Sequence, residues 1–170
     1  MKAKALSIIL VLFLLISAIG CSAPTAPLVT KVIDGDTIEV NIGGIIHKVR
    51  YIGIDTPELT DERPEFYALA QEATRFNREL VEGKTIRLEK DVSETGRYGR
   101  LLRYIYVEDI LVNAELVRQG LAWAKSYPPD TKYQDILEKA EAEARRDKIG
   151  LWGVGSIRIA YQLKLDKQSK

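Results

Sequence analysis

The fold is decided by one stretch, residues 29–54, which reads VTKVIDGDTIEVNIGGIIHKVRYIGI. The stretch is rich in β-branched residues, and two turn signals interrupt it, Asp34-Gly35-Asp36 and Gly43-Gly44. This pattern predicts three consecutive strands paired as a meander, over residues 29–33, 37–42 and 45–54.

The rest of the chain predicts two more strands and three helices. Strands are expected over residues 85–90 and 101–107, joined by a polar loop that contains Gly96 and Gly99. Helices are expected between Pro64 and Gly83, from Asn113 as N-cap to Gly120, and over residues 130–148 with Tyr133, Ile136, Leu137, Ala140 and Ala144 facing inward. Five such strands cannot leave both faces in water, so we expect an α+β fold, a five-stranded OB-fold β-barrel with three α-helices packed at its side.

The first twenty residues predict an export signal. Lys2 and Lys4 precede an uncharged apolar run over residues 5–19, which is short of the ~20 residues that a spanning helix needs. We therefore divide the chain into a signal peptide (1–20), a lipidated Cys21 with a linker (21–27), one domain (28–153) and a C-terminal tail (154–170). The protein is expected outside the cytoplasm.

Cys21 is the only cysteine, which excludes an internal disulfide. The sequence Ala18-Ile19-Gly20-Cys21 is similar to a bacterial lipobox, in which the cysteine is acylated and becomes the first mature residue. A lipid on Cys21 would anchor the domain on the extracytoplasmic side of a membrane. If the cut lies elsewhere, Cys21 is discarded or free and the protein is secreted.

Charge and residue types narrow the chemistry. The precursor has a net charge of +1, and loss of Lys2 and Lys4 takes the side-chain balance to −1, so a uniformly basic coat for nucleic acid is absent. His47 is the only histidine, which rules out a two-histidine metal site, and its place in the middle of a predicted strand argues against a His-based triad. Catalysis is left to carboxylates, arginines, tyrosines and hydroxyls.

Two acidic clusters lie at strand junctions: Asp34-Gly35-Asp36-Thr37, and Asp55-Thr56-Pro57-Glu58. Hard oxygen ligands brought together by two loops suit Ca²⁺ or Mg²⁺, although the same residues also make turns without any metal. Arg50 and Arg100 carry planar guanidinium groups that suit a phosphoryl transition state, and each also fits an ordinary strand or hairpin surface.

The joint order of several motifs resembles the staphylococcal thermonuclease family over residues 28–152. The motifs are VIDGDT (32–37), RYIGIDTPE (50–58), YGRLLRYIY (98–106), VNAELVRQG (112–120) and GLW (150–152). Several independent motifs in order are far more specific than any one of them.

The resemblance implies a calcium-dependent endonuclease that cuts DNA and RNA with little sequence preference and leaves 3′-phosphates. Asp36, Asp55 and the Thr56 carbonyl would bind Ca²⁺, Arg50 and Arg100 would bind the scissile phosphate, and Glu58 would act as general base or orient the water. Arg97, Tyr98 and Tyr127 are expected to contact the substrate of a monomeric enzyme.

One departure and one alternative function accompany this hypothesis. The best-known member of the family carries a nucleotide-stacking aromatic pair after the second helix. In this chain Trp123 or Tyr127 is expected to take that role. The alternative is a catalytically inactive OB-fold lipoprotein that binds nucleic acid, since fold alone does not establish activity.

Overall fold

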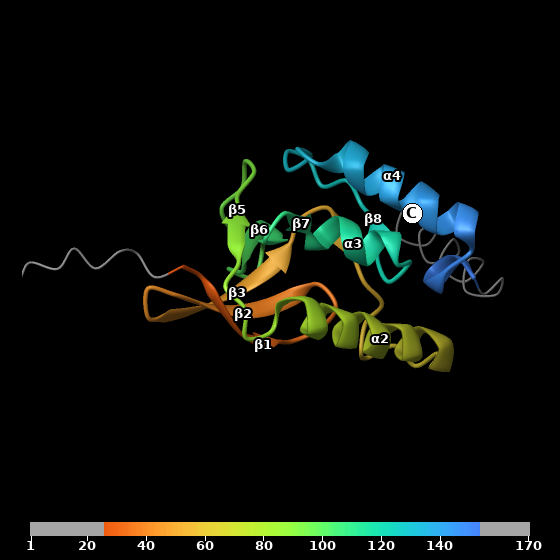
Figure 1. The fold of residues 1–170 in the computed structure, drawn as a ribbon, viewed down its shortest axis with the longest axis horizontal. Helices are drawn as coiled ribbons and strands as arrows, with labels where there is room; N and C mark the ends of the chain where they lie inside the picture. Colours follow the sequence, from red (N-terminus) through yellow and green to blue (C-terminus); the bar gives the residue numbers. More distant parts are fainter. Residues whose placement is uncertain (1–25, 154–170) are drawn as a thin grey trace, which may run out of the picture.

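The structure, a computed structural model, describes residues 26–153 (Figure 1). The predicted signal peptide, Cys21 and the tail 154–170 lie outside the described residues, so these parts of the domain division stay predictions.

The strands form a mixed sheet in the order β1-β2-β3-β6-β5. The meander is confirmed, because β1 (Leu28–Val32), β2 (Thr37–Ile42) and β3 (Ile45–Tyr51) pair antiparallel in sequence. β6 (Leu101–Val107) then lies parallel to β3, and β5 (Arg87–Glu89) and the short β7 (Ile110–Leu111) pair antiparallel with β6. The parallel pair is what brings the start of β6 beside the end of β3.

The two edges of this sheet meet without a full ladder. Leu28 of β1 forms a bridge to Thr85, just before β5, and the Ile86 amide donates a hydrogen bond to the Pro27 carbonyl at 2.9 Å. The Val29 amide donates to the Lys84 carbonyl at 3.0 Å. The sheet therefore curls into an α+β fold consistent with an OB-fold, whose barrel is tied by these few bonds and is not closed by paired strands.

The third predicted strand was expected to continue to residue 54, and that prediction is wrong. β3 ends at Tyr51, and Gly53 turns the chain with a positive φ of 77°. The next two residues form β4 (Ile54–Asp55), which pairs with β8 (Trp123–Ala124) in a separate small sheet. A Cβ on residue 53 would lie 2.4 Å from Leu137 Cδ1, so glycine suits both the φ angle and the close packing.

Three α-helices pack beside the strands, as predicted, and α3 contacts both α2 and α4 (Figure 1). They are α2 (Pro64–Val81), α3 (Val112–Arg118) and α4 (Gln134–Asp147), and a 3₁₀ turn, η1 (Gly150–Trp152), follows. None of the helices within residues 26–153 is both long and apolar enough to cross a membrane.

Two details of the helices differ from the prediction. Asn113 is not the N-cap of α3: Leu111 takes that position, and the buried Asn113 side chain instead bonds the backbone of β6 and of the turn after β3. α4 begins at Gln134 rather than near residue 130, and Ile136 is 47% exposed rather than inward. Leu137, Ala140 and Ala144 are buried as expected.

The core is one apolar cluster between the curled sheet and the helices. It joins strand residues such as Ile38, Val49 and Ile105 to Leu116 of α3 and Leu137 of α4. A smaller cluster joins Phe66 of α2 to Trp123 of β8 and Leu151 of η1. The loops that carry the acidic motifs lie at the rim of this core.

Candidate active site

The loop between β1 and β2 is folded by its own side chains. Asp34 Oδ1 accepts a hydrogen bond from the Asp36 amide at 3.0 Å, and the amide of Ile33 donates to the Thr37 carbonyl at 3.0 Å. A Cβ on Gly35 would lie 2.8 Å from both Ala73 Cβ and Thr56 Cγ2. Only glycine therefore lets this loop press against α2 and against the second acidic motif.

Asp36 joins the two acidic motifs, as the sequence predicts. Its side chain is buried, and Oδ2 accepts hydrogen bonds from the Thr56 amide and the Thr56 Oγ1 hydroxyl, both at 3.0 Å. Oδ1 accepts a third bond from Thr37 Oγ1 at 3.2 Å. The Asp36 carboxylate thus holds Thr56, which follows β4, against the loop that precedes β2.

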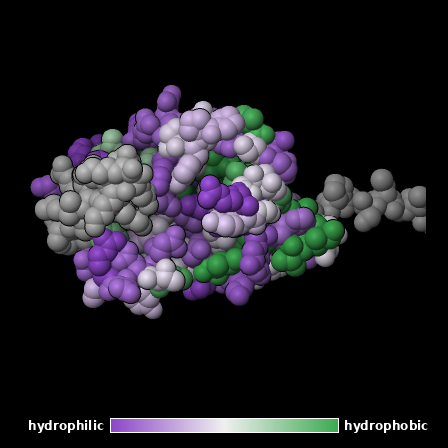
Figure 2. Space-filling view, turned by 180° about the vertical axis from the view of Figure 1, so that it is seen from behind, coloured by the Kyte–Doolittle hydropathy of each residue, from purple (hydrophilic) through white to green (hydrophobic). Residues whose placement is uncertain are grey.

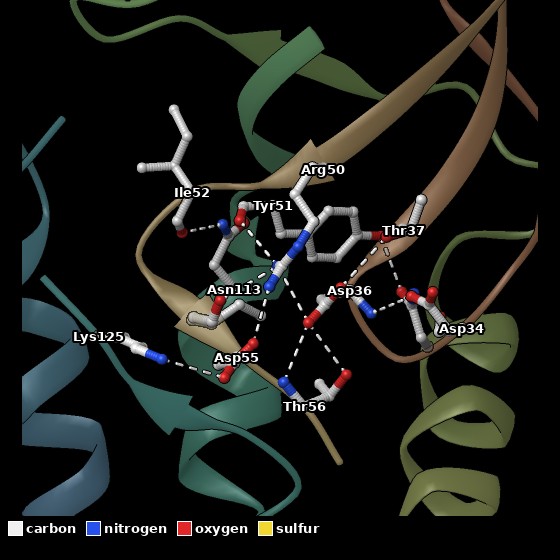
Figure 3. A network of polar contacts seen from close by, with 12 residues as sticks. Asp34, Asp36, Thr37, Arg50, Tyr51, Ile52, Asp55, Thr56, Asn113 and Lys125 are labelled. Carbon is white, nitrogen blue, oxygen red and sulfur yellow. Dashed lines mark hydrogen bonds and ion pairs between the residues drawn. The ribbon is translucent and has the colours of Figure 1, made fainter. Parts of the chain in front are cut away.

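Arg50, near the end of β3, lies between Asp36 and Asp55 (Figure 3). Its Nη1 is 3.0 Å from Asp36 Oδ2, and its Nη2 is 3.0 Å from Asp55 Oδ1. Nη1 also donates to the carbonyls of Tyr51 and Ile54, at 3.2 and 3.1 Å. The planar guanidinium has five N–H donors. Arg50 can therefore bond these carboxylates and carbonyls and still offer further N–H groups, including Nε–H, to a ligand.

Burial raises the pKa of Asp36 from its ordinary value of 3.8 to about 7. Arg50 opposes this shift, whereas the charges of Asp34 and Asp55 add to it. Burial is the main cause of the shift, and a cation bound beside Asp36 would favour its charged form and lower its pKa.

The residues fit calcium by their chemistry. Asp36, Asp55 and Thr56 supply hard oxygen atoms from two loops, and Ca²⁺ accepts carboxylate, carbonyl and water ligands together. Within residues 26–153, however, no three acidic, histidine or cysteine side chains are arranged as a finished metal cage. Arg50 contacts both carboxylates, so a cation and the guanidinium would compete for them.

Arg100 lies on the same side of the fold as the acidic motifs. Its Nη1 donates to Thr37 Oγ1 at 3.4 Å, next to Asp36, and the parallel β3–β6 pair accounts for this proximity. A cavity of about 260 Å³ opens between the two arginines, lined by Arg50, Tyr51, Ile52, Gly53, Arg100, Leu102, Tyr127 and Asp130. Two arginines thus line one hollow.

Three other predicted residues, Arg97, Tyr98 and Glu58, are not among those that line this hollow. Tyr98 is 77% exposed, and the Arg100 guanidinium lies 5.8 Å from its ring centroid. Arg97 is exposed in the same loop. Glu58 is exposed three residues after Asp55, and its carbonyl accepts the Asp61 amide at 3.0 Å. The roles of Arg97, Tyr98 and Glu58 stay predictions.

The structure gives Tyr127 and Trp123 different surroundings. Tyr127 lines the cavity and is 42% exposed, and the Lys125 Nζ lies 5.6 Å from its ring centroid. Trp123 is 5% exposed and stacks on Phe66 with ring centroids 6.2 Å apart. Tyr127 is therefore the aromatic side chain available to a nucleotide, and Trp123 belongs to the core.

Three supporting residues escaped the sequence analysis, and two of them lie beside the acidic motifs. Lys125 Nζ lies 3.4 Å from Asp55 Oδ2, although 70 positions separate the two residues. The buried Asn77 of α2 accepts the Tyr51 hydroxyl at 2.8 Å and donates to the Asp34 carbonyl at 3.1 Å, which ties the acidic loop to β3. In the sequence, Asn77 is marked only as a polar residue within the apolar stripe of a helix. Lys125 is marked only as a lone lysine in a loop.

The third of these residues, Asp130, supports the walls of the site together with Asn113. Asn113 accepts the Ile105 amide at 2.9 Å and donates to the Ile52 carbonyl at 2.8 Å, so it holds the turn after β3 against β6 (Figure 3). Asp130 Oδ1 accepts the amides of Val92 and Ser93, at 3.0 and 2.7 Å. It thereby fixes the base of the loop that carries Tyr98 and Arg100.

Comparisons with known proteins agree with this architecture. Residues 48–154 match the family described as "Staphylococcal nuclease homologue". The chain is 38% identical to the thermonuclease of Staphylococcus intermedius over 125 residues, which cover 74% of each chain. It is 39% identical to the thermonuclease of Staphylococcus hyicus over 73% of each chain, and 40% identical to endonuclease YncB of Bacillus subtilis over 72% of this chain and 59% of YncB. The chain belongs to the staphylococcal nuclease family.

Proposed function

We propose that this protein is a calcium-dependent endonuclease that hydrolyses DNA, RNA or both with little sequence preference and leaves 3′-phosphates. A nuclease function follows from the family and from relatives named thermonuclease and endonuclease. One observation carries the proposal: Arg50 and Arg100 face a single cavity, and Arg50 also contacts Asp36 and Asp55 at its edge.

In this proposal Asp36, Asp55 and the Thr56 carbonyl bind Ca²⁺. The ion would supply positive charge beside the phosphate and polarise an attacking water. It would also favour the charged form of Asp36, whose pKa is raised mainly by burial. Lys125 adds a further positive charge beside Asp55.

The two arginines bind the scissile phosphate. Negative charge grows on the phosphoryl oxygens as water attacks, and guanidinium groups already held in place stabilise that charge without reorganising. Arg50 is fixed by carbonyl and carboxylate contacts, and Arg100 by Thr37. Contacts directed at phosphate carry no base information, which accounts for low sequence preference.

The remaining side chains complete the reaction and hold the substrate. Glu58 accepts a proton from the attacking water or orients that water. Tyr127 stacks on a base in the cavity, and Arg97 and Tyr98 contact the neighbouring nucleotide. We propose that the enzyme works as a monomer, exported and anchored outside the cytoplasm by lipid on Cys21, or secreted where Cys21 is not acylated.

The test is degradation of single-stranded DNA in Ca²⁺, with and without a chelator. We expect degradation that stops on chelation, and 3′-phosphate ends on the products. Glu58→Ala and Arg100→Ala should each lower the rate by roughly 10²-fold or more with the melting temperature near the parent's. Binding of DNA without any cleavage in Ca²⁺ would instead favour an inactive nucleic-acid-binding protein.

A further inference from the structure

The turn between β2 and β3 forms an apolar, uncharged tip over residues 42–46, read as Ile-Gly-Gly-Ile-Ile. Ile45 is 63% exposed and Ile46 is 51% exposed. A Cβ on Gly43 or Gly44 would meet no atom within 4 Å, so the turn stands clear of the rest of the protein. We call residues 42–46 the hairpin tip.

The apolar side chains of the hairpin tip project from both faces of the sheet. Ile46 pairs with Asn41, and Asn41 pairs with Leu28, so Leu28 and Ile46 share the outer face. Leu28 is 40% exposed. Ile45 pairs with Ile42 and therefore lies on the opposite face. An ordinary half-buried hairpin exposes polar residues on its outer face, so this arrangement requires another explanation.

Charged residues begin one row behind the hairpin tip. The next outer row joins Lys31, Glu39 and Lys48 across the three strands. An apolar end followed by lysines suits the surface of a bilayer, where the apolar part enters the lipid and lysines reach the head groups. Two lysines against one glutamate also favour anionic head groups.

The hairpin tip lies at the end of the molecule where the described chain begins. Ala26 comes two residues before Leu28, which shares the outer row with Ile46. Figure 1 shows the first described residues and the β2–β3 turn at the same end, and Figure 2 shows apolar side chains gathered there. Cys21 precedes Ala26 by five residues, a reach of at most about 18 Å. A lipid on Cys21 would therefore hold the hairpin tip close to the bilayer.

We propose that the hairpin tip, together with Leu28, binds a phospholipid bilayer and orients the domain on it. β3 has the hairpin tip at one end and Arg50 near the other, five residues from Ile45. At a rise of about 3.3 Å per residue, Arg50 lies roughly 17 Å along the strand from the lipid contact. The cavity between the arginines then stays open to a polyanion in solution.

Vesicle binding tests this proposal on the chain from residue 21 to 170, which keeps all of the described core. Cys21→Ser removes acylation, so any binding comes from the polypeptide and not from a lipid anchor, and the paired variants below assign it to the hairpin tip. Vesicles of phosphatidylcholine and phosphatidylglycerol should sediment the parent protein. Ile45→Ser with Ile46→Ser should lower the partition coefficient at least about tenfold. The matched control, Ile110→Ser with Ile136→Ser, changes two isoleucines that are each 47% exposed and should stay within about twofold.

A reporter at the hairpin tip keeps the proposal testable if a double variant folds poorly. An environment-sensitive fluorophore on Ile45→Cys, in the Cys21→Ser background, should brighten when vesicles are added, and the same label on Ile136→Cys should not. No sedimentation of the parent, equal losses in the control, or no fluorescence change at residue 45 would overturn the proposal. A lipid-free dimer that the hairpin-tip substitutions dissociate would overturn it too, because a second copy would then cover the apolar residues. Nuclease activity on soluble DNA should be unchanged in all of these variants, which separates this proposal from the proposed function.

Discussion

Arg50 Nη1 lies 3.0 Å from Asp36 Oδ2, and the same guanidinium reaches Asp55 with its other terminal nitrogen. A residue proposed to bind phosphate thus also neutralises the residues proposed to bind calcium. Arg50 and the ion would share the carboxylates, and this sharing leads to the first two predictions.

Replacement of Arg50 by alanine should affect stability differently with and without calcium. Loss of the guanidinium leaves the buried Asp36 carboxylate without its ion-pair partner and leaves Asp55 with Lys125, so Arg50→Ala should lower the free energy of unfolding in chelator by about 3 kcal/mol. Calcium should restore more stability to the variant than it adds to the parent, because the ion replaces the lost positive charge. Urea unfolding with and without Ca²⁺ measures both differences. An equal loss in the two conditions would show that the ion does not bind these carboxylates.

The stability of the calcium-free protein should depend on the protonation of Asp36. Its pKa is raised in the folded state to about 7, so the contribution of this group to stability is complete below about pH 4 and disappears as the pH rises through 7. An amide side chain cannot ionise, so the Asp36→Asn variant should become the more stable protein above pH 7, by on the order of 1–3 kcal/mol. Unfolding curves between pH 4 and 8 in chelator would reveal this. A constant difference between the two proteins across that range would contradict it.

Asn113 should matter to stability more than its place near the start of a helix suggests. Asn113→Ala leaves the Ile105 amide and the Ile52 carbonyl buried without their partner, at a cost of about 2–4 kcal/mol. Asn41→Ala is the control, because the Asn41 side chain accepts the amide of the exposed Gly44, where water can replace it. Chemical denaturation of the two variants should separate them by more than about 1 kcal/mol. Similar losses would mean that the Asn113 bonds contribute little.

Asp130 should control how firmly the loop with Arg100 is held. Asp130→Ala removes the acceptor of the Val92 and Ser93 amides, so we expect faster hydrogen exchange at both amides and a KM raised about tenfold. Asp130→Asn keeps a carbonyl oxygen in this position and should behave closer to the parent. Exchange rates that are unchanged in Asp130→Ala would argue against this role.

Tyr127 and Trp123 should differ in what their loss affects. Tyr127→Ala should raise KM about tenfold, since a stacked base contributes roughly 1–3 kcal/mol, and should leave the melting temperature almost unchanged. Trp123→Ala should destabilise the protein by about 3–5 kcal/mol through the cavity left beside Phe66. Steady-state kinetics and thermal unfolding on both variants check the assignment. A stability loss in Tyr127→Ala with normal KM would reverse it.

The sequence predicted the local parts of this protein well because its turn and strand signals act over a few residues. Asp36, Arg50 and Asp55 belong to compact motifs next to strand ends, and the structure brings them together. Lys125 could not be predicted to lie near Asp55, because the contact depends on the β4–β8 pair across 70 positions.

The errors also have physical causes. Asn113 has the residue type of an N-cap, but its amide bonds backbone groups from two other elements, and burial decides its role. α4 starts late because Asp130 is occupied by the amides of residues 92 and 93, and Tyr133 packs on Tyr104 with ring centroids 4.7 Å apart. Tertiary contacts of this kind leave no local pattern in the sequence.

The hydrogen bonds between residues 27–29 and 83–86 also have a mechanical consequence. If the protein is tethered through residues upstream of Ala26, a pull on the tether first acts on two backbone hydrogen bonds, between Pro27 and Ile86 and between Val29 and Lys84. A force directed along β1 would load these bonds and the β1–β2 ladder together, and would have to shear them rather than open them one at a time. The strand nearest the tether would then resist drag from a long captured polymer, and Arg50 and Arg100 would keep their spacing under tension.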